Sequence, residues 1–385
     1  MGKPRLVLIL GGGVGGLVAA NRLRKLLPAS DRVVIVDRRE EHLFAPSLLW
    51  LMIGARKAAN ISRSLKRLNK KGIEFIQGEV RQISPEERRV RVGERDFHAD
   101  ALILALGAEL ADDLIPGLAE SGHNLYTLDG AQAIRDALSS FNGGQIIVLT
   151  AAPMYKCPAA PYEAAMLLEY DLRRRGLKLK TQISLYASEP GPMGTAGPEI
   201  SAAVKDMVES KGIKYFPGHQ VVSVIPGSRL IEFANGARAN FDLLIYVPPH
   251  RAPAVVKDAG LLAENGWVAV DRHIFETKHK LVFAIGDMTA VPLKMGKPLP
   301  KAGVFAHAQA EVVARNIARV WTGKGEPAAF DGFGECFIET GDHRAGIGRG
   351  NFYAEPVPQM TMKAPSLYWH LGKVLFEKRW LWKWF

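Results

Sequence analysis

The two cysteines of the chain, Cys157 and Cys336, are the residues whose type could combine redox chemistry with nucleophilic attack. Cys157 follows Lys156 and precedes a predicted helix, and a neighbouring cation and a helix N-terminus both favour the thiolate form. Glu163, about one and a half turns into that helix, would exchange protons with the thiolate if the helix points it back. Cys336 lies on a predicted strand far along the chain. Spacing alone does not decide whether the thiols meet, so two unrelated buried cysteines are the alternative.

A glycine-rich segment near the N-terminus is the second feature with chemical meaning. Gly11, Gly13 and Gly16 match G-x-G-x-x-G, between the predicted strand Leu6–Leu10 and a predicted helix. In this context the glycines form a tight turn, admit a pyrophosphate to the backbone and let helix and strand pack closely. Asp37 ends the next predicted strand, about 20 residues after the motif, as expected for an acid that binds ribose hydroxyls. The segment predicts a dinucleotide site, the alternative being a glycine turn without a ligand.

The elements that must position these residues form an internal repeat, two copies of one order of strands and helices roughly 140 residues apart. Each copy opens with a buried strand, Leu6–Leu10 and Ile146–Leu149, and closes with a buried strand after an aspartate, Asp100–Ala105 and Asp242–Val247. Helices are predicted between them, at Gly15–Leu27 in the first copy and Pro161–Arg175 in the second. Alternating strands and helices predict an α/β fold of two tandem Rossmann-like dinucleotide-binding domains, followed by a C-terminal membrane-associating region.

The second copy has lost the glycine loop. The three motif glycines fall opposite Thr150, Ala152 and Tyr155, and Pro153 also lies in the turn. Side chains and a missing N–H therefore occupy the place where a pyrophosphate needs bare backbone. We expect a nicotinamide dinucleotide to bind poorly here, the alternative being a diverged loop that still binds NADH by other contacts.

Two short segments resemble flavin-binding motifs of the flavin disulfide-reductase superfamily. Leu281–Asp287 resembles the late motif, in which the aspartate binds the ribityl chain, and Ala105-Leu106-Gly107 resembles the short middle motif. The resemblance implies FAD, whereas the glycine motif alone does not separate FAD from NAD. The expected cofactor-binding residues are Gly11, Gly13, Gly16, Asp37, Val80, Gly107, Gly286, Asp287 and Lys301.

The segments around both cysteines resemble the sulfide:quinone oxidoreductase and flavocytochrome c sulfide dehydrogenase family. Lys156–Glu163 is similar to its first redox-cysteine motif and Cys336–Glu339 to its second, while Pro248–Pro253 and Pro300–Ala306 are similar to other family segments. The resemblance covers nearly the whole chain. It implies oxidation of hydrogen sulfide to polysulfide or sulfane sulfur through a redox cysteine pair, with electrons passing through FAD to quinone.

The resemblance also implies roles for single residues. The expected catalytic residues are Cys157, Cys336, Glu163 and Lys301, and Lys301 would stabilise negative charge on the reduced flavin. The chain lacks the early cysteine that binds FAD covalently in some members, so its FAD should be non-covalent. His307 stands where many members carry a glutamate.

The last residues, Pro365–Phe385, differ in composition from the rest of the chain. They hold four of the seven tryptophans among basic residues. Such a tail suits the headgroup region of a membrane, where it would lie on the surface beside a quinone pocket with Phe337 and Phe352. The alternative is a tail docked on its own protein or on a partner subunit. The expected domains are 1–113 (FAD, first part), 114–266 (second Rossmann-like domain), 267–325 (FAD, second part) and 326–385 (C-terminal region).

Composition limits the remaining possibilities. The net charge of +11 favours acidic partners, for which we expect an anionic membrane surface and not nucleic acid. No signal peptide or transmembrane run is visible, so we expect a peripheral protein of the cell membrane. The protein could form a homo-oligomer. Two cysteines exclude a disulfide scaffold and a four-cysteine metal site, and we expect no metal. The competing functions are a single-subunit NADH:quinone dehydrogenase, the flavoprotein subunit of a flavocytochrome c, and a non-catalytic flavin-binding interaction protein.

Overall fold

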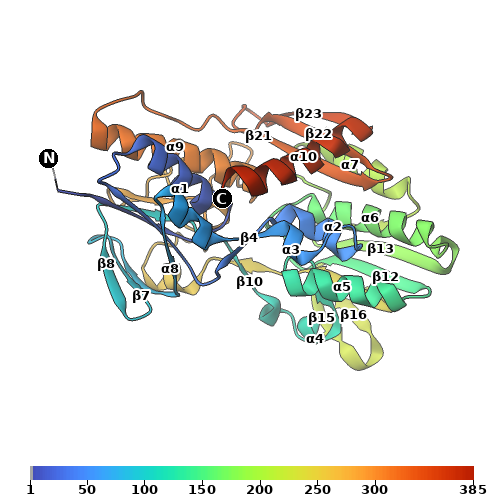
Figure 1. The fold of residues 1–385 in the computed structure, drawn as a ribbon. Helices are drawn as coiled ribbons and strands as arrows, with labels where there is room; N and C mark the ends of the chain where they lie inside the picture. Colours follow the sequence, from blue (N-terminus) through green and yellow to red (C-terminus); the bar gives the residue numbers. More distant parts are fainter. Residues whose placement is uncertain (1–2) are drawn as a thin grey trace.

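A parallel five-stranded sheet carries the glycine motif. The computed structural model describes residues 3–385, and it orders this sheet β20-β9-β1-β2-β5 (Figure 1). The strands are β1 (Leu6–Leu10), β2 (Arg32–Asp37), β5 (Glu74–Gln77), β9 (Ala101–Leu104) and β20 (Val282–Ala284). β20 comes from far along the chain and pairs with β9, which pairs with β1. The turns that follow β1, β9 and β20 therefore meet at the carboxyl edge of the sheet, where ligands of open α/β sheets bind.

Both faces of this sheet are covered, and for that reason β1 is buried along its whole length. On one face Val7 and Ile9 pack against α1, which in turn packs against α9 (Figure 1). On the other face Leu8 and Leu10 pack against an antiparallel three-stranded meander and α8. These elements are α1 (Val14–Leu26), α9 (Gly303–Thr322), β6 (Val80–Ser84), β7 (Arg89–Val92), β8 (Arg95–His98) and α8 (Ala254–Asp258).

A second parallel sheet repeats this plan, in the order β11-β18-β12-β13-β14. Ile146 and Val148 face the cluster that contains α5, α6 and α7, and Ile147 and Leu149 face a second meander. The strands are β11 (His123–Asn124), β12 (Gly144–Thr150), β13 (Thr181–Ala187), β14 (Lys214–Phe216) and β18 (Leu243–Val247). The covering elements are α5 (Leu128–Ser140), α6 (Ala160–Arg174), α7 (Pro198–Glu209), β15 (Val221–Ile225), β16 (Leu230–Phe233) and β17 (Arg238–Asn240).

The C-terminal region is an antiparallel sheet, β21-β22-β23, with the long helix α10 lying across it (Figure 1). β21 also packs against α6, which brings the second cysteine segment to the helix that follows the first. The elements are β21 (Phe333–Gly341), β22 (Arg344–Asn351), β23 (Gln359–Ser366) and α10 (Leu367–Lys383). Short elements complete the fold: β3 (Glu41–Leu43) with β4 (Ser62–Ser64), β10 (Glu109–Leu110) with β19 (His250–Arg251), α2 (Leu48–Met52), α3 (Ala58–Ile61) and α4 (Leu118–Ser121).

The predicted fold class is confirmed, because two parallel α/β units of the same plan precede the C-terminal sheet. The helices predicted at Gly15–Leu27 and Pro161–Arg175 each begin one residue earlier, as α1 and α6. The domain boundaries remain a prediction. Along residues 3–385, every helix is too short or too polar to cross a bilayer.

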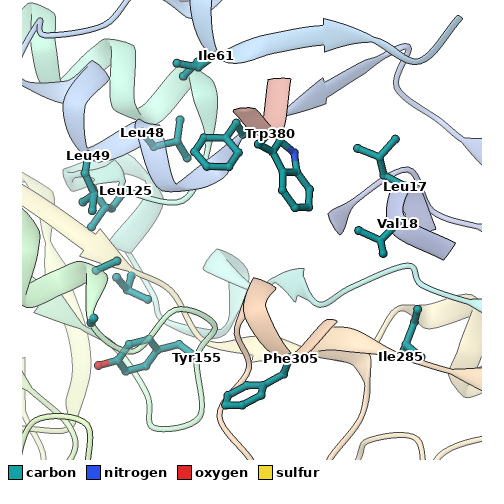
Figure 2. Packing of buried hydrophobic residues seen from close by; sticks show 14 of the residues in the cluster. Leu17, Val18, Leu48, Leu49, Ile61, Leu125, Tyr155, Ile285, Phe305 and Trp380 are labelled. Atoms are coloured by element: carbon teal, nitrogen blue, oxygen red, sulfur yellow. The ribbon is translucent and has the colours of Figure 1, made fainter. Parts of the chain in front are cut away.

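The tail departs in part from its expected orientation. The side chains of Trp380, Trp384 and Lys373 are buried and not directed to a headgroup layer. Figure 2 shows Trp380 with Leu48 on one side and Leu17 on the other, in the main hydrophobic core. The Trp380 indole donates a hydrogen bond to the His42 imidazole over 3.1 Å, which helps to hold the helix on the protein. One face of α10 therefore belongs to the fold, as the docked-tail alternative anticipated.

Candidate active site

The glycine turn after β1 forms a cradle that side chains would fill. A Cβ on Gly11 would lie 2.3 Å from the carbonyl oxygen of Ala105, and one on Gly16 would lie 1.8 Å from that of Gly11. Gly13, by contrast, faces open space and begins α1, whose first turn has neither a side-chain cap nor an acidic residue. The first N–H groups of α1 are thus available to an anion. The turn therefore fits a pyrophosphate.

The other expected FAD residues surround the same edge of the sheet. Asp37 accepts hydrogen bonds from the backbone N–H of Gly12 (2.6 Å) and that of Arg39 (2.8 Å). Val80 begins β6 shortly after the end of β5, whose last residue Gln77 pairs with Asp37. Gly107 and Gly286 adopt the left-handed conformation, with φ of 72° and 75°. These turns continue the cradle from β2 across β9 to β20.

Asp287 lies directly after Gly286, and the charges of the half-buried Lys156 and the buried Lys301 act on its carboxylate. Burial raises the Asp287 pKa, and the charges of Lys156 and Lys301 oppose that rise. Among the described residues no side chain or N–H donates a hydrogen bond to this carboxylate. An acceptor without a donor at the carboxyl edge of the sheet fits the hydroxyl groups of a ribityl chain, so the residues present fit FAD.

His250 is a further polar residue of the site, and one of its ring nitrogens lacks a hydrogen-bond partner among the described residues. Its Nδ1 lies 2.9 Å from the carbonyl oxygen of Pro248, and its buried Nε2 has no hydrogen-bond partner among the described residues. Burial lowers the His250 pKa to about 3, and the charges of Lys156 and Lys301 lower it further. A neutral imidazole that donates to Pro248 presents an acceptor at Nε2. Sequence reasoning undervalued this residue, because a lone histidine in a proline-rich turn has no distinguishing pattern.

Lys301 is a structural centre of the site and not a surface lysine. Its ammonium donates to the carbonyl oxygens of Asp287 and Thr289, each over 2.7 Å, and it lies 3.4 Å from the ring centroid of Trp267. Burial lowers the Lys301 pKa to about 8, while Asp287 opposes this change. Two carbonyl groups and an aromatic face thus hold a cation beside the late flavin motif.

Cys157 is tied to this segment through its backbone. Its N–H donates to the carbonyl oxygen of Lys301 over 2.6 Å, and the hydroxyl of Tyr126 donates to its carbonyl over 3.0 Å. Its φ of 49° is in the left-handed region, which costs a non-glycine residue free energy. Lys301 therefore links the first redox-cysteine segment directly to Asp287 of the flavin motif.

β21, which carries Cys336, packs against α6, which begins three residues after Cys157. The Cys157 pKa is raised, and the charge of Cys336 contributes to that rise. Burial is the larger cause of that rise, and Glu163 adds to it. Burial likewise raises the Cys336 pKa to about 12, with Glu163 again adding to the effect. The expected thiolate at Cys157 is therefore wrong for the free thiol, because loss of water outweighs the helix N-terminus. In both cases Lys373 opposes the rise, and the expected neighbour Lys156 also interacts with Cys157, whose charge raises the Lys156 pKa against the effect of burial.

Glu163 reaches this pair from the first turns of α6. Its side chain is buried, and one carboxylate oxygen accepts from the N–H of Glu339 and from the ammonium of Lys373, each over 2.7 Å. The charge of Glu163 acts on both thiols, and its expected role in proton exchange with Cys157 stays a prediction. Its partners Glu339 and Lys373 were not foreseen, because each lies more than 170 positions away along the chain.

The second copy of the plan holds a carboxylate in place of a nucleotide. Glu189 follows β13, as Asp37 ends β2, and its carboxylate accepts from the hydroxyls of Thr150 (2.9 Å), Tyr162 (2.9 Å) and Tyr155 (2.5 Å). An acid at this strand end would otherwise bind ribose hydroxyls. Here hydroxyls of the protein take that role, and the degenerate loop folds onto them.

Comparison with known proteins places the chain in a family. The family model described as pyridine nucleotide-disulphide oxidoreductase matches residues 5–310, so the chain belongs to that family. A protein of Aquifex aeolicus named sulfide-quinone reductase is 29% identical, covering 98% of this chain and 90% of its own length. A mouse mitochondrial sulfide:quinone oxidoreductase is 26% identical, covering 95% and 85%. A solved structure of the Aquifex aeolicus enzyme has a TM-score of 0.89 at 27% identity and covers 99% of this chain and 91% of that one.

These relatives confirm the resemblance seen in the sequence, together with the class of flavoprotein oxidoreductase. Proteins of this family and its sulfide-oxidising relatives are FAD-dependent, in agreement with the expected cofactor. The assignment of single residues to FAD binding or catalysis remains a prediction that the geometry makes concrete.

Proposed function

We propose that the protein oxidises hydrogen sulfide with a redox cysteine pair and passes the electrons through FAD to quinone. Hydrosulfide attacks a disulfide or polysulfide that links Cys157 to Cys336. For the disulfide, HS⁻ and Cys–S–S–Cys give Cys–S–SH and Cys–S⁻, so atoms and charge balance. FAD, when bound, supplies the two-electron acceptor from which quinone is reduced. Sulfur accumulates on the cysteines and leaves as polysulfide or sulfane sulfur.

The observation that carries the proposal is the hydrogen-bonded link from Cys157 to the flavin motif. The Cys157 N–H binds the Lys301 carbonyl, and the Lys301 ammonium binds the Asp287 carbonyl. This link would fix the thiol at the edge where the flavin is expected, while β21 brings Cys336 to the same place. Lys301 keeps a positive charge beside the flavin site, which stabilises negative charge that develops there.

The NADH-oxidising alternative is disfavoured by the Glu189 cluster. A nicotinamide dinucleotide would have to displace three hydroxyls from this carboxylate and settle on a loop that contains Pro153. Sulfide, in contrast, needs only access to the cysteines.

The test is anaerobic addition of sulfide or NADH to the purified holoprotein while flavin absorbance is followed. Sulfide should bleach the flavin promptly, and NADH should not. The variants Cys157→Ser and Cys336→Ser should each retain FAD and lose sulfide-driven bleaching by at least about 100-fold, because the nucleophilic sulfur is gone. Bleaching by NADH alone, or full sulfide activity in both variants, would overturn the proposal.

We further propose that the exposed face of α10 binds the membrane surface. Leu367, Leu371, Leu375 and Trp382 lie on one side of the helix and are 54%, 55%, 67% and 81% exposed. Lys378 and Arg379 are exposed beside this apolar stripe, which suits anionic headgroups. A tail in this position would admit quinone from the bilayer, and Phe337, which contacts α10 near Gly372, would line its entry.

Co-sedimentation with vesicles of anionic phospholipid tests this orientation. The double variant Leu371→Asp with Leu375→Asp should lose most vesicle binding while its flavin still responds to sulfide. Leu179→Asp is the matched control, because Leu179 is fully exposed on the second α/β unit. Equal binding by the double variant and the wild type would remove the membrane role of α10.

A further inference from the structure

The inner face of α10 carries charged groups that lie in the protein interior. Lys373 is 6% exposed, and its ammonium lies 2.7 Å from Glu163 and 3.9 Å from Glu339. One turn earlier, His370 places its Nδ1 2.6 Å from the other oxygen of Glu339. The four residues come from α6, β21 and α10 and form one connected cluster, which we call the α10 ion cluster.

The charges of this cluster affect the pKa of both cysteine thiols. Lys373 lowers the pKa of Cys157 and of Cys336, and Glu163 raises both. Burial alone would lower the Lys373 pKa, but Glu163 and Glu339 raise it, so this lysine remains charged. The cysteine compartment therefore has a permanent buried cation, and α10 supplies it.

The charges of the cluster leave one proton to share. Lys373 balances one of the two carboxylates, Glu163 and Glu339. Burial raises the Glu339 pKa, and Lys373 and His370 oppose that rise. A single proton held between Glu339 and His370 makes the cluster neutral, and its two sites are joined by the 2.6 Å contact. Glu339 Oε2 is buried, lies 3.9 Å from the Lys373 ammonium and has no hydrogen-bond partner among the described residues, which leaves it free to take a proton.

The far end of the cluster reaches solvent. The His370 side chain is 14% exposed, and its ring centroid is 5.3 Å from that of the exposed His343. The other groups around it are Trp50, which stacks edge-on against His370, and Tyr170, whose hydroxyl lies 3.3 Å from His343. Beyond these, Asp342 is paired with Arg173 at 2.7 Å and with Lys211 at 3.6 Å. Arg56 lies over Trp50 at 4.5 Å and is itself paired with Glu377 at 2.9 Å, so the charged groups around His370 are compensated by other partners.

The proposed reaction needs such a path. Oxidation of hydrosulfide to sulfane sulfur follows HS⁻ → S⁰ + H⁺ + 2e⁻ at the cysteines, and the electrons leave through the flavin to quinone, where reduction to quinol takes up two protons at a separate place. The proton appears among half-buried thiols whose raised pKa values favour their neutral forms. If this proton stayed near the cysteines, it would protonate the nucleophilic thiolate that the next step needs.

We propose that the α10 ion cluster is the proton exit of the cysteine compartment, with Glu163 and Glu339 receiving the proton and His370 passing it to water. Lys373 is a positioning residue that acts through the two carboxylates, whereas His370 is a proton relay that does not contact the substrate. The inference rests on the proposed function, and it assigns to α10 a role in the chemistry of the cysteines in addition to its expected place on the membrane.

The first test replaces His370. In the holoprotein, His370→Ala should slow sulfide-driven flavin bleaching by about tenfold or more, because a proton relay is lost. Added imidazole should restore the rate, since the side-chain position is partly exposed, whereas sodium chloride of equal ionic strength should not. His279→Ala is the matched control, because His279 is 13% exposed and also faces a carboxylate, Glu86 at 3.7 Å. A wild-type rate in His370→Ala, or a loss that imidazole does not restore while FAD content is normal, would overturn the proposal.

The second test needs no turnover and separates this inference from the proposed function. The rate at which iodoacetamide alkylates the dithiothreitol-reduced protein is measured against pH. Lys373→Met should shift the profile to higher pH by about one unit or more, because the thiolates lose their cation, and Lys373→Arg should keep the wild-type profile. An unshifted profile in Lys373→Met refutes the inference. Failure of wild-type bleaching by sulfide refutes the proposed function instead.

Discussion

At the scale of single residues, the glycines of the turn meet two different requirements, close packing of the backbone and open space for a ligand. The sequence motif does not distinguish them. Gly16 is needed by the fold, since its Cβ would meet the Gly11 carbonyl oxygen at 1.8 Å, whereas Gly13 has open space around it and a φ of −70° that any residue adopts. One glycine therefore serves packing, and the other serves the ligand.

This difference predicts distinct outcomes for two alanine variants. Gly16→Ala should lower the melting temperature and reduce the yield of folded protein. Gly13→Ala should fold normally but retain less FAD after gel filtration, because its methyl group would occupy the space of the pyrophosphate. Flavin absorbance and thermal unfolding of the FAD-free proteins distinguish them. Normal FAD content in Gly13→Ala would place the phosphates elsewhere.

The buried neutral imidazole of His250 makes a prediction about pH. Its pKa is lowered to about 3 in the fold, whereas the unfolded residue takes up a proton near pH 6.5. Stability is therefore lost as pH falls below 6.5, by up to about 2 kcal/mol at pH 5 from this residue alone. Thermal midpoints at pH 7.5 and pH 5 should differ less in His250→Gln than in the wild type. His98→Gln, at an exposed position, should keep the wild-type difference.

At the scale of elements, α10 has two working faces. Its outer stripe contains Leu367, Leu371, Leu375 and Trp382. Its inner face contains Lys373, Glu377, Trp380 and Leu381. Glu377 is itself compensated, by Arg56 at 2.9 Å and by the hydroxyl of Ser47 at 2.6 Å. The helix is therefore held to the protein by buried polar pairs and by the buried Trp380 and Leu381, while the apolar side chains of the outer stripe remain exposed.

Alanine substitution of one tryptophan on each face of α10 should have different effects on stability and on vesicle binding. Trp380→Ala removes a 3% exposed side chain from the core and should lower the free energy of unfolding by about 3–5 kcal/mol. Trp382→Ala removes an 81% exposed side chain and should change it by less than about 0.5 kcal/mol, while weakening vesicle binding. Urea unfolding followed by circular dichroism measures the difference. Equal stability losses would contradict the two-faced helix.

Sequence patterns predicted the parallel units, the glycine turn and both cysteine segments, because each depends on neighbours along the chain. The inner face of α10 was misjudged for the opposite reason. A lysine that alternates with tryptophans is typical of a headgroup layer, and nothing local shows that Glu163, 210 positions away, will meet it. Glu189 was missed in the same way, since its hydroxyl donors Thr150, Tyr155 and Tyr162 come from other parts of the chain.

At the scale of the whole molecule, one architectural plan has been used for two tasks. The first copy keeps its cradle at the carboxyl edge of the sheet. The second copy uses the same edge to position Cys157, and the C-terminal sheet adds Cys336 and the inner face of α10. The expected site thus lies where three parts of the chain meet, and for that reason it could be identified residue by residue but not assembled from the sequence.

The closed Glu189 cluster has a consequence for the cell that contains this protein. A flavoenzyme with an open second nucleotide site would exchange electrons with the dissolved nicotinamide pool in either direction. With that site filled by its own tyrosines, the proposed enzyme would connect sulfide only to the quinone pool. Electrons from sulfide could not be diverted to biosynthetic reduction, and a high NADH level could not drive sulfide formation from sulfane sulfur.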